Sequence, residues 1–318
     1  MLAARLRRSA TLNVAFITHP DCLLHNMGAW HPEAPARVQA VEDQLIASGL
    51  GNLLLHAEAP CATREQLERV HDAAYLDAVE GAAPEHGLVH LDPDTAMCPQ
   101  TLQAALRAAG AAVLATDMVM SAQAESAFCN VRPPGHHAER ARAMGFCLFN
   151  NVAVAAAHAL EHHGMQRVAI VDFDVHHGNG TEDIFRDDER VLMVSTFQHP
   201  FYPYSGIQGR SERMVNVPLP AYTDGRGFRR AVEAEWLPAL ERFRPEAMFV
   251  SAGFDAHRED DMASLGLVEA DYVWVTERIK EVADRYAAGR IVSVLEGGYN
   301  LSALARSVVA HLKALAGV

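Results

Sequence analysis

Acidic and imidazole side chains follow an apolar run in the segment VAIVDFDVHHGNGTEDIF, residues 168–185. Asp172, Asp174 and His176 stand at every second position where the apolar run ends. Unpaired carboxylates at a buried edge cost free energy, so this pattern favours a metal ion as their charge partner. These three residues are the first candidates for a reactive site.

Three other apolar runs are also followed by residues that can do chemistry. His136 and His137 lie in RPPGHH, Asp255 lies in GFDAH, and Tyr299 lies in EGGYN. In an open parallel sheet the ligand crevice lies beyond the carboxyl ends of the strands, so these segments are predicted to meet at one rim. Each segment alone is compatible with a turn, but four together favour a shared site.

The residue types at this rim predict a catalytic metal. Asp174, His176 and Asp255 offer two carboxylate oxygens and one imidazole nitrogen, with room for water, as catalytic zinc prefers. Two carboxylates neutralise the ion, so the bound water is acidified less and a separate base is needed. His136 and His137 are the candidates for that base.

Neighbouring residues complete the predicted chemistry. Each histidine of the pair needs a partner on its other ring nitrogen to fix its tautomer, and Asp172 and Asn179 can supply these partners. Tyr299, next to two glycines, can donate its hydroxyl to an oxyanion. Together these groups describe metal-assisted hydrolysis of an amide.

Several of these residues also have ordinary structural explanations. A histidine pair is often a satisfied core pair, and Tyr299 alone is more often a packed aromatic. Cys147 has no base at a suitable spacing and is predicted to be a small core residue rather than a nucleophile. His158, His162 and His163 lie on a helical pattern and are predicted to be solvated or structural.

Composition limits the classes of protein. The 318 residues carry a formal net charge of −13, which argues against a nucleic-acid surface. Five cysteines without a CxxC pair fit a reducing compartment, and we expect the cytoplasm. No apolar run reaches the length of about 18 residues that a membrane span needs. The Arg-rich residues 1–11 are expected to be a flexible extension.

The elements that must position the site alternate between short apolar runs and helical patterns. The predicted strands are Ala127–Val131, Val168–Phe173, Val191–Thr196, Ala247–Ala252 and Ile291–Leu295. The predicted helices are 34–48, Thr101–Met120, Asn150–His163, Phe228–Arg242, Ala270–Tyr286 and Ser302–Leu315. This alternation predicts an α/β protein with a parallel sheet flanked by helices. With no internal repeat or linker, residues 1–318 are expected to form a single domain.

Four long segments resemble a known family. RPPGHHAERARAMGFCLFNN, DFDVHHGNGT, SAGFDAHREDD and LEGGYN are similar to signature segments of the zinc-dependent histone deacetylases. The similarity is strongest to the class II branch and to bacterial histone deacetylase-like amidohydrolases, relatives of the acetylpolyamine amidohydrolases. It runs from HPEAPAR, at His31, to the last helix.

The resemblance implies a fold and a metal centre. The fold would be an arginase/deacetylase-like three-layer α/β sandwich with an eight-stranded, mostly parallel sheet. One catalytic zinc would lie on Asp174, His176 and Asp255. Structural potassium is also implied, at a first site with Asp172, Asp174, His176, Ser195 and Thr196, and at a second near Phe185 and Val191.

The resemblance also implies residue roles. His137 matches the general base and acid, and His136 matches a charged companion paired to Asp172. Asn179 stands where class I members carry an acid, and Tyr299 matches the residue that polarises the scissile carbonyl. The residues that match the substrate channel are Gly145, Phe146, Tyr202, Met262 and Gly297, with Phe146 and Tyr202 flanking an acyl-lysine stem.

The substrate is left open between two classes. Polyamine-selective relatives carry an acid at the channel wall, where this chain has Met262, although Glu259, Asp260 and Asp261 stand immediately before it. Asp260 matches a structural aspartate of the family. The expected substrate is therefore an acylated lysine or a small acylated amine, with an acetylated polyamine as the alternative.

Two other classes of function fit the sequence less well. An arginase-type binuclear hydrolase would need further acids at the positions of Gly178 and His257. An inactive module that binds acylated amines would be expected to have lost a metal ligand, the base or Tyr299, and all are present. A homo-oligomer is compatible with the sequence.

Overall fold

The computed structural model describes residues 12–207 and 211–318. The expected N-terminal extension, residues 1–11, lies outside the described residues. The strands are β1 (Val14–Thr18), β2 (Leu55–Glu58), β3 (Val89–Asp92), β4 (Thr95–Met97), β5 (Ser126–Cys129), β6 (Val168–Asp172), β7 (Val191–Gln198), β8 (Met214–Leu219), β9 (Ala247–Ala252) and β10 (Ile291–Leu295). The α-helices are α1 (Ala36–Ser48), α2 (Arg64–Glu68), α3 (Ala73–Gly81), α4 (Thr101–Met120), α5 (Asn151–Glu161), α6 (Asn179–Phe185), α7 (Gly225–Ala231), α8 (Leu237–Phe243), α9 (Glu269–Tyr286) and α10 (Leu301–Ala316). Short helical turns are η1 (Pro20–Leu23), η2 (Gly51–Leu53) and the π-helical η3 (Val232–Trp236), which joins α7 to α8.

Eight strands form one sheet in the order β2-β1-β5-β10-β9-β6-β7-β8. Every pairing between neighbours in this sheet is parallel. The strands β3 and β4 pair separately as an antiparallel hairpin. Since all eight strands of the large sheet run the same way, the loops that follow β5, β6, β9 and β10 lie at the same edge.

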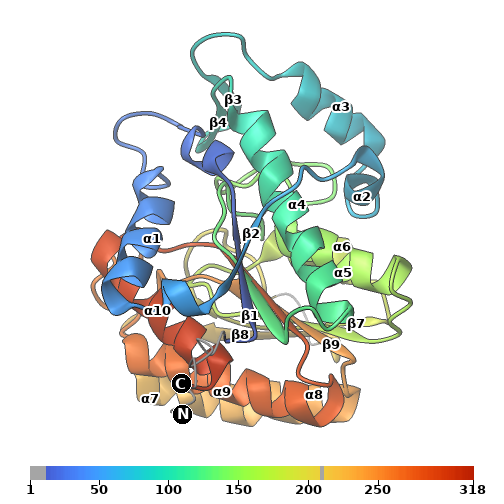
Figure 1. Ribbon diagram of the computed structural model, residues 1–318, viewed down its shortest axis with the longest axis vertical. Helices are drawn as coiled ribbons and strands as arrows, with labels where there is room; N and C mark the ends of the chain where they lie inside the picture. The colour runs from blue at the N-terminus through green and yellow to red at the C-terminus, as the bar shows by residue number, and fades with distance from the viewer. Residues whose placement is uncertain (1–11, 208–210) are drawn as a thin grey trace, which may run out of the picture.

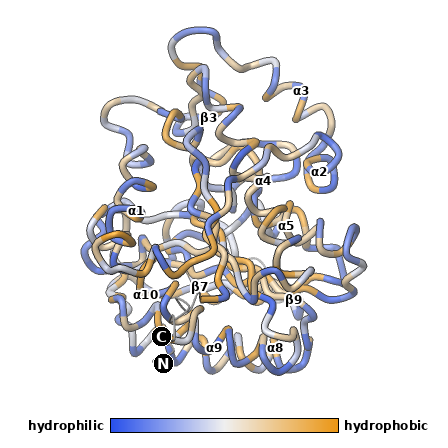
Figure 2. The backbone as a smooth tube through the Cα atoms, in the orientation of Figure 1, coloured by the Kyte–Doolittle hydropathy of each residue, from blue (hydrophilic) through white to orange (hydrophobic). Residues whose placement is uncertain are grey.

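Helices cover both faces of the sheet, as Figure 1 shows. Alternate strand residues point into two cores: Ile170 and Phe249 belong to the core beneath α4 and α5, whereas Val171 and Val250 belong to the core beneath α1, α9 and α10. Figure 2 shows hydrophobic segments gathered in the central strands and hydrophilic segments along the outer loops. The strands read as continuous apolar runs because both of their faces are buried.

The helix α4 is notable for its composition. Among the described residues it is the one helix long and apolar enough, by length and composition, to cross a membrane, and 61% of its apolar window is buried within the fold. It packs against the sheet and α5, where small residues such as Ala108 and Ala112 are fully buried. Its apolar character therefore has an explanation in packing.

Candidate metal centre and active site

Two loops at the carboxyl edge of the sheet bring three potential metal ligands together. Asp174 and His176 follow β6, and Asp255 follows β9, which pairs with β6. One ligand atom from each of the three lies within 4.8 Å of the others, and all three residues are buried. His176 Nδ1 lies 2.9 Å from Asp174 Oδ1 and 3.2 Å from Asp255 Oδ2.

The other carboxylate oxygens of this group of three residues, called the cradle below, show that it fits a cation. Asp174 Oδ2 accepts from Gly297 N at 2.8 Å, and Asp255 Oδ1 accepts from Val175 N at 2.9 Å, so the carboxylates are held in place. Asp255 Oδ2 is buried and makes no well-aligned hydrogen bond within the described residues, although it faces His176. An orphaned carboxylate oxygen between two other potential ligands is the arrangement that a divalent ion satisfies.

The pKa values of the cradle residues also favour a bound cation. Burial, together with the neighbouring charge of Asp174, raises the pKa of Asp255 to about 6. Burial alone would lower the pKa of His176, but its hydrogen bond to Asp174 and the nearby carboxylate of Asp255 raise it to about 10. The paired carboxylates thus demand a positive charge at this point. Replacing the proton on His176 by a divalent cation would meet that demand and free its Nδ1 lone pair for coordination.

The histidine pair after β5 lies beside this cradle, and its members have different partners. His136 Nδ1 lies 3.0 Å from Asp172 Oδ2, and His137 Nδ1 lies 2.8 Å from Asn179 Oδ1. Burial opposes the charge on His136, yet Asp174 and Asp172 raise its pKa well above the ordinary value. Burial, then the charges of His136 and His176, hold the pKa of His137 well below its ordinary value. One imidazole is therefore charged and the other neutral at neutral pH.

Two glycines allow backbone to approach these side chains. A Cβ on Gly145 would lie 2.4 Å from a ring carbon of His137, and its φ of 56° is in the left-handed region. A Cβ on Gly297 would lie 2.0 Å from Asp255 Oδ2. A larger residue at Gly145 would displace His137, and one at Gly297 would displace Asp255.

Glu139 extends the chain of contacts behind His137, and sequence reasoning missed it. Asn179 Nδ2 donates to Glu139 Oε1 at 2.8 Å, which turns Asn179 Oδ1 towards His137. An amide oxygen only accepts, so His137 carries its proton on Nδ1 and keeps the Nε2 lone pair available. Glu139 stands two residues after His137 in RPPGHHAE, so its closeness to the pair in the sequence was a usable signal.

The loop that carries Tyr299 is held by Asp260. Asp260 Oδ2 accepts from the backbone N–H groups of Tyr299, at 2.6 Å, and Asn300, at 2.9 Å, and its Oδ1 accepts from Met262 N at 3.0 Å. Burial raises the pKa of Tyr299 well above its ordinary value despite the opposing charge of Arg37, so the phenol keeps its proton. Asp260 is thus a structural residue, and its carboxylate is not part of the channel wall.

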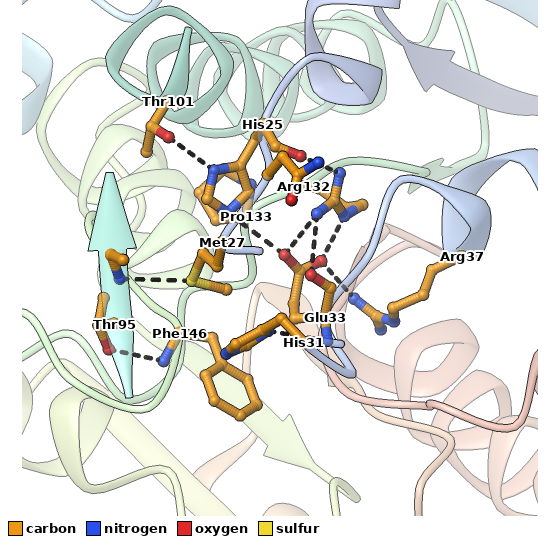
Figure 3. Close-up of polar contacts among 12 residues, drawn as sticks. His25, Met27, His31, Glu33, Arg37, Thr95, Thr101, Arg132, Pro133 and Phe146 are labelled. Atoms are coloured by element: carbon orange, nitrogen blue, oxygen red, sulfur yellow. Dashed lines mark hydrogen bonds and ion pairs between the residues drawn. The ribbon is translucent and has the colours of Figure 1, made fainter. Parts of the chain in front are cut away.

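A buried ion network contacts the same loop, and Figure 3 shows the polar contacts of Glu33 with Arg37, Arg132 and His25. Arg37 donates to Gly298 O at 2.6 Å and to Glu296 O, and its guanidinium lies 5.0 Å from the centre of the Tyr299 ring. Glu33 binds this arginine at 3.0 Å and Arg132 Nη2 at 2.6 Å, and all three side chains are fully buried. The sequence predictions did not include this network, because Arg132 is 99 residues from Glu33 in the chain.

Aromatic side chains lie close to the histidine pair and to Tyr299. Phe146 lies edge-on to Tyr299, with ring centroids 6.0 Å apart, and to His31 at 4.6 Å. Tyr202 lies edge-on to His137 at 5.3 Å. Met262 is partly exposed. The Glu259 carboxylate forms an ion pair with Arg306, with Oε2 2.9 Å from Nη2.

The residues implied for potassium fall into two groups. Ser195 of β7 and Ser251 of β9 lie opposite Asp172 in the sheet register, and both hydroxyls are buried without a hydrogen-bond partner within the described residues. Thr196 follows Ser195 in β7, so this group stands beside the cradle. Phe185 ends α6 and Val191 begins β7, and both are buried around the turn between these elements.

The two positions that a second arginase-type metal would need offer no carboxylate. Gly178 packs close to Asp172 and His136, where a Cβ would lie 2.4 Å from Asp172 Oδ2. His257 is buried, accepts from Glu259 N through Nδ1 at 3.1 Å, and its Nε2 lies 3.5 Å from Glu269. Neither position therefore supplies the carboxylate that an arginase-type second metal would need.

Comparisons with known proteins agree along most of the chain. A family model described as histone deacetylase domain matches residues 31–315. The histone deacetylase-like amidohydrolase of Pseudomonas aeruginosa is 37% identical over 314 residues, 94% of this chain and 82% of that protein. Histone deacetylase 14, chloroplastic, of Arabidopsis thaliana is 40% identical over 309 residues, 90% of this chain and 73% of that protein. The crystal structure of the HDA15 HD domain has a TM-score of 0.89 at 32% identity and covers 97% of this chain and 89% of that one. The expected deacetylase-like α/β fold with an eight-stranded sheet is thereby confirmed.

Proposed function

Because the chain belongs to the histone deacetylase domain family, we propose that it is a zinc-dependent deacetylase that hydrolyses the amide of an acylated lysine or a similar amine. Membership of the family supports deacetylase or amidohydrolase chemistry in general. The finer proposal depends on one observation, the convergence of Asp174, His176 and Asp255 next to a neutral His137.

Asp174, His176 and Asp255 would hold the zinc ion. When bound there, zinc would polarise the acyl oxygen and acidify the attacking water. The two carboxylates and the orphaned oxygen of Asp255 support this assignment. A structural potassium beside Asp172, Ser195 and Thr196 is part of the same proposal, supported by the unpartnered Ser195 hydroxyl.

The protein's own residues then move the protons. His137 Nε2 takes a proton from water as oxygen attacks the amide carbon, while Nδ1 stays bound to Asn179. The protonated Tyr299 hydroxyl donates a hydrogen bond to the developing oxyanion. His137 then returns the proton to the departing nitrogen, and the products are acetate and a free amine. His136, held charged by Asp172, stabilises the negative charge without giving up its proton.

The channel favours an acyl-lysine over an acetylated polyamine. A second ammonium group would need an acid at the wall. Asp260 is occupied by backbone N–H groups, Glu259 is paired with Arg306, and Met262 is apolar. The flanking Phe146 and Tyr202 suit an apolar stem instead.

Three measurements test this proposal. Deacetylation of an acetyl-lysine peptide should be lost on chelation and restored by zinc, and Tyr299→Phe should lower kcat by about 10²–10³ while retaining the metal. Tight binding of the peptide without turnover by the zinc-loaded protein would instead favour a binding module. Comparing kcat/KM for the peptide and for acetylated polyamines decides the substrate class.

A further inference from the structure

Three histidines and one aspartate gather at the edge of the sheet opposite the active site. Asp117 lies in the last turn of α4, His158 lies in the last turn of α5, and His162 and His163 follow α5 directly. One donor atom from each of the four lies within 4.8 Å of the others. The chain leaves this cluster to enter β6 at its amino end, whereas the catalytic residues follow the carboxyl ends of the strands.

The contacts within this cluster are close. Asp117 Oδ1 lies 2.9 Å from His158 Nε2 and 2.7 Å from His163 Nε2. The rings of His158 and His162 stack with centroids 4.7 Å apart and an interplanar angle of 12°, and His162 lies 4.9 Å from His163. Two helix C-termini meet here, and their partial negative charges favour a cation.

Burial and neighbouring charges affect the protonation of His158. Burial, opposed by Asp117 and assisted by the charge of Arg69, lowers the pKa of His158. Neutral rings offer nitrogen lone pairs, which are metal ligands.

We propose that Asp117, His158, His162 and His163 form a second metal site that takes zinc and ties the ends of α4 and α5 together. Three imidazole nitrogens and one carboxylate oxygen make a closed four-ligand set, which suits structural zinc rather than the oxygen-seeking Mg²⁺ or Ca²⁺. This site stands apart from the catalytic residues, so the inference does not depend on the proposed function.

Arg69 limits the affinity of this site. Its Nη1 lies 2.8 Å from His158 Nδ1, and a guanidinium only donates, so Nδ1 accepts and the proton of His158 stands on Nε2. Coordination through Nε2 requires that proton to leave and Arg69 to move aside. Arg69 also pairs with the exposed Glu65 at 3.2 Å and has room to turn towards it. The arginine therefore competes with the metal for His158.

The test counts zinc in the zinc-loaded wild-type protein and in His162→Gln, after equilibrium dialysis against a range of free zinc concentrations. His162 is exposed, so its replacement should leave the fold intact. The wild type should bind one more zinc per chain than the variant, and the second ion should be at least about 10-fold weaker in Asp117→Asn. Zinc should also raise the Tm of the wild type more than that of His162→Gln, with the same deacetylase activity in both.

Two further variants sharpen the test. Arg69→Leu removes the competing donor and should tighten the second site by about 10-fold or more. The exposed His86→Gln is a matched control that should bind as the wild type does. Equal zinc counts in wild type, Arg69→Leu and His162→Gln, with no difference in the Tm shift, would overturn the proposal and leave the cluster as a hydrogen-bonded group only.

Discussion

Replacing Glu33 by glutamine tests the buried ion network that supports the Tyr299 loop. Glu33 accepts hydrogen bonds from Arg132 and Arg37, and its Oε2 lies 3.3 Å from His25 Nε2. Burial acts to raise the pKa of Glu33, but Arg132, His25 and Arg37 hold it well below the ordinary value. The carboxylate is therefore charged in the folded protein at neutral pH.

The size of the effect follows from the charges. Glutamine keeps the shape of the side chain but removes its negative charge, so two fully buried guanidinium groups, Arg132 and Arg37, lose their common counter-ion. Its amide N–H₂ also turns a donor towards groups that only donate. Breaking one side of a buried ion pair costs about 3–5 kcal/mol, so we expect the free energy of unfolding to fall by this amount.

Urea unfolding, followed through tryptophan fluorescence, to which the buried Trp236 contributes, measures this change. The m-value should be the same in the wild type and in the variant. Glu68→Gln is a matched control, because Glu68 pairs with Arg64 at 2.7 Å on the surface and its loss should cost less than about 1 kcal/mol. A loss in Glu33→Gln no larger than that in the control would refute the reasoning.

Three other substitutions probe the base, the pH dependence of stability and the channel. Glu139→Ala should lower kcat by about 10- to 100-fold with little change in KM, because the Asn179 amide loses the acceptor that orients it towards His137. An unchanged kcat would show that Glu139 does not position Asn179. Burial lowers the pKa of His71 to about 4 in the folded protein. As the pH falls, the unfolded chain therefore binds a proton on this histidine before the folded protein does. The free energy of unfolding should be largest above about pH 6.5 and fall by up to about 3 kcal/mol as the pH drops to about 4. In His71→Gln the acid-side slope of Tm against pH should be shallower, and a slope equal to that of the wild type would contradict this assignment. Met262→Glu should raise kcat/KM for acetylated polyamines relative to an acetyl-lysine peptide by at least about 10-fold, and a constant ratio would show that this residue does not face the second ammonium.

The sequence predicted the strands that carry the site, because both of their faces are buried and they read as continuous apolar runs. The bounds of β9 and β10 are those expected, and α4 spans Thr101–Met120 as predicted. The strands β1, β2 and β8 were not predicted. Two of them lie at the sheet edges: β2 is only half buried and β8 contains Pro218, which an edge strand tolerates. The strand β1 follows directly on an Arg-rich stretch, which masks its apolar run.

The helix expected over Phe228–Arg242 differs in its details. It begins at Gly225, where Asp224 caps the N-terminus by accepting from Gly227 N at 2.8 Å. A π-helical turn, Val232–Trp236, interrupts it and turns Trp236 into the core. Neither feature changes the apolar periodicity enough to be visible in the sequence.

The sequence predicted the acidic and imidazole residues that converge, together with Asp172 and Asn179 as partners of the histidine pair, but not the buried ion network behind them. Asp174 and His176 are two residues apart, so their convergence is visible in the sequence. Glu33 and Arg132 are separated by 99 residues, and their pairing depends on the packing of α1 beside the end of β5. Nothing in the spacing of such residues indicates contact, and a buried charge network of this kind is visible only in three dimensions.

Anomalous X-ray scattering at the zinc edge, from crystals of the zinc-loaded protein, tests the central claim most directly. We predict an anomalous peak for a zinc ion coordinated by Asp174, His176 and Asp255 together, at about 2.0–2.2 Å from each ligand atom. The peak should be absent in Asp174→Ala. An active enzyme with no anomalous peak at these three residues would contradict the account.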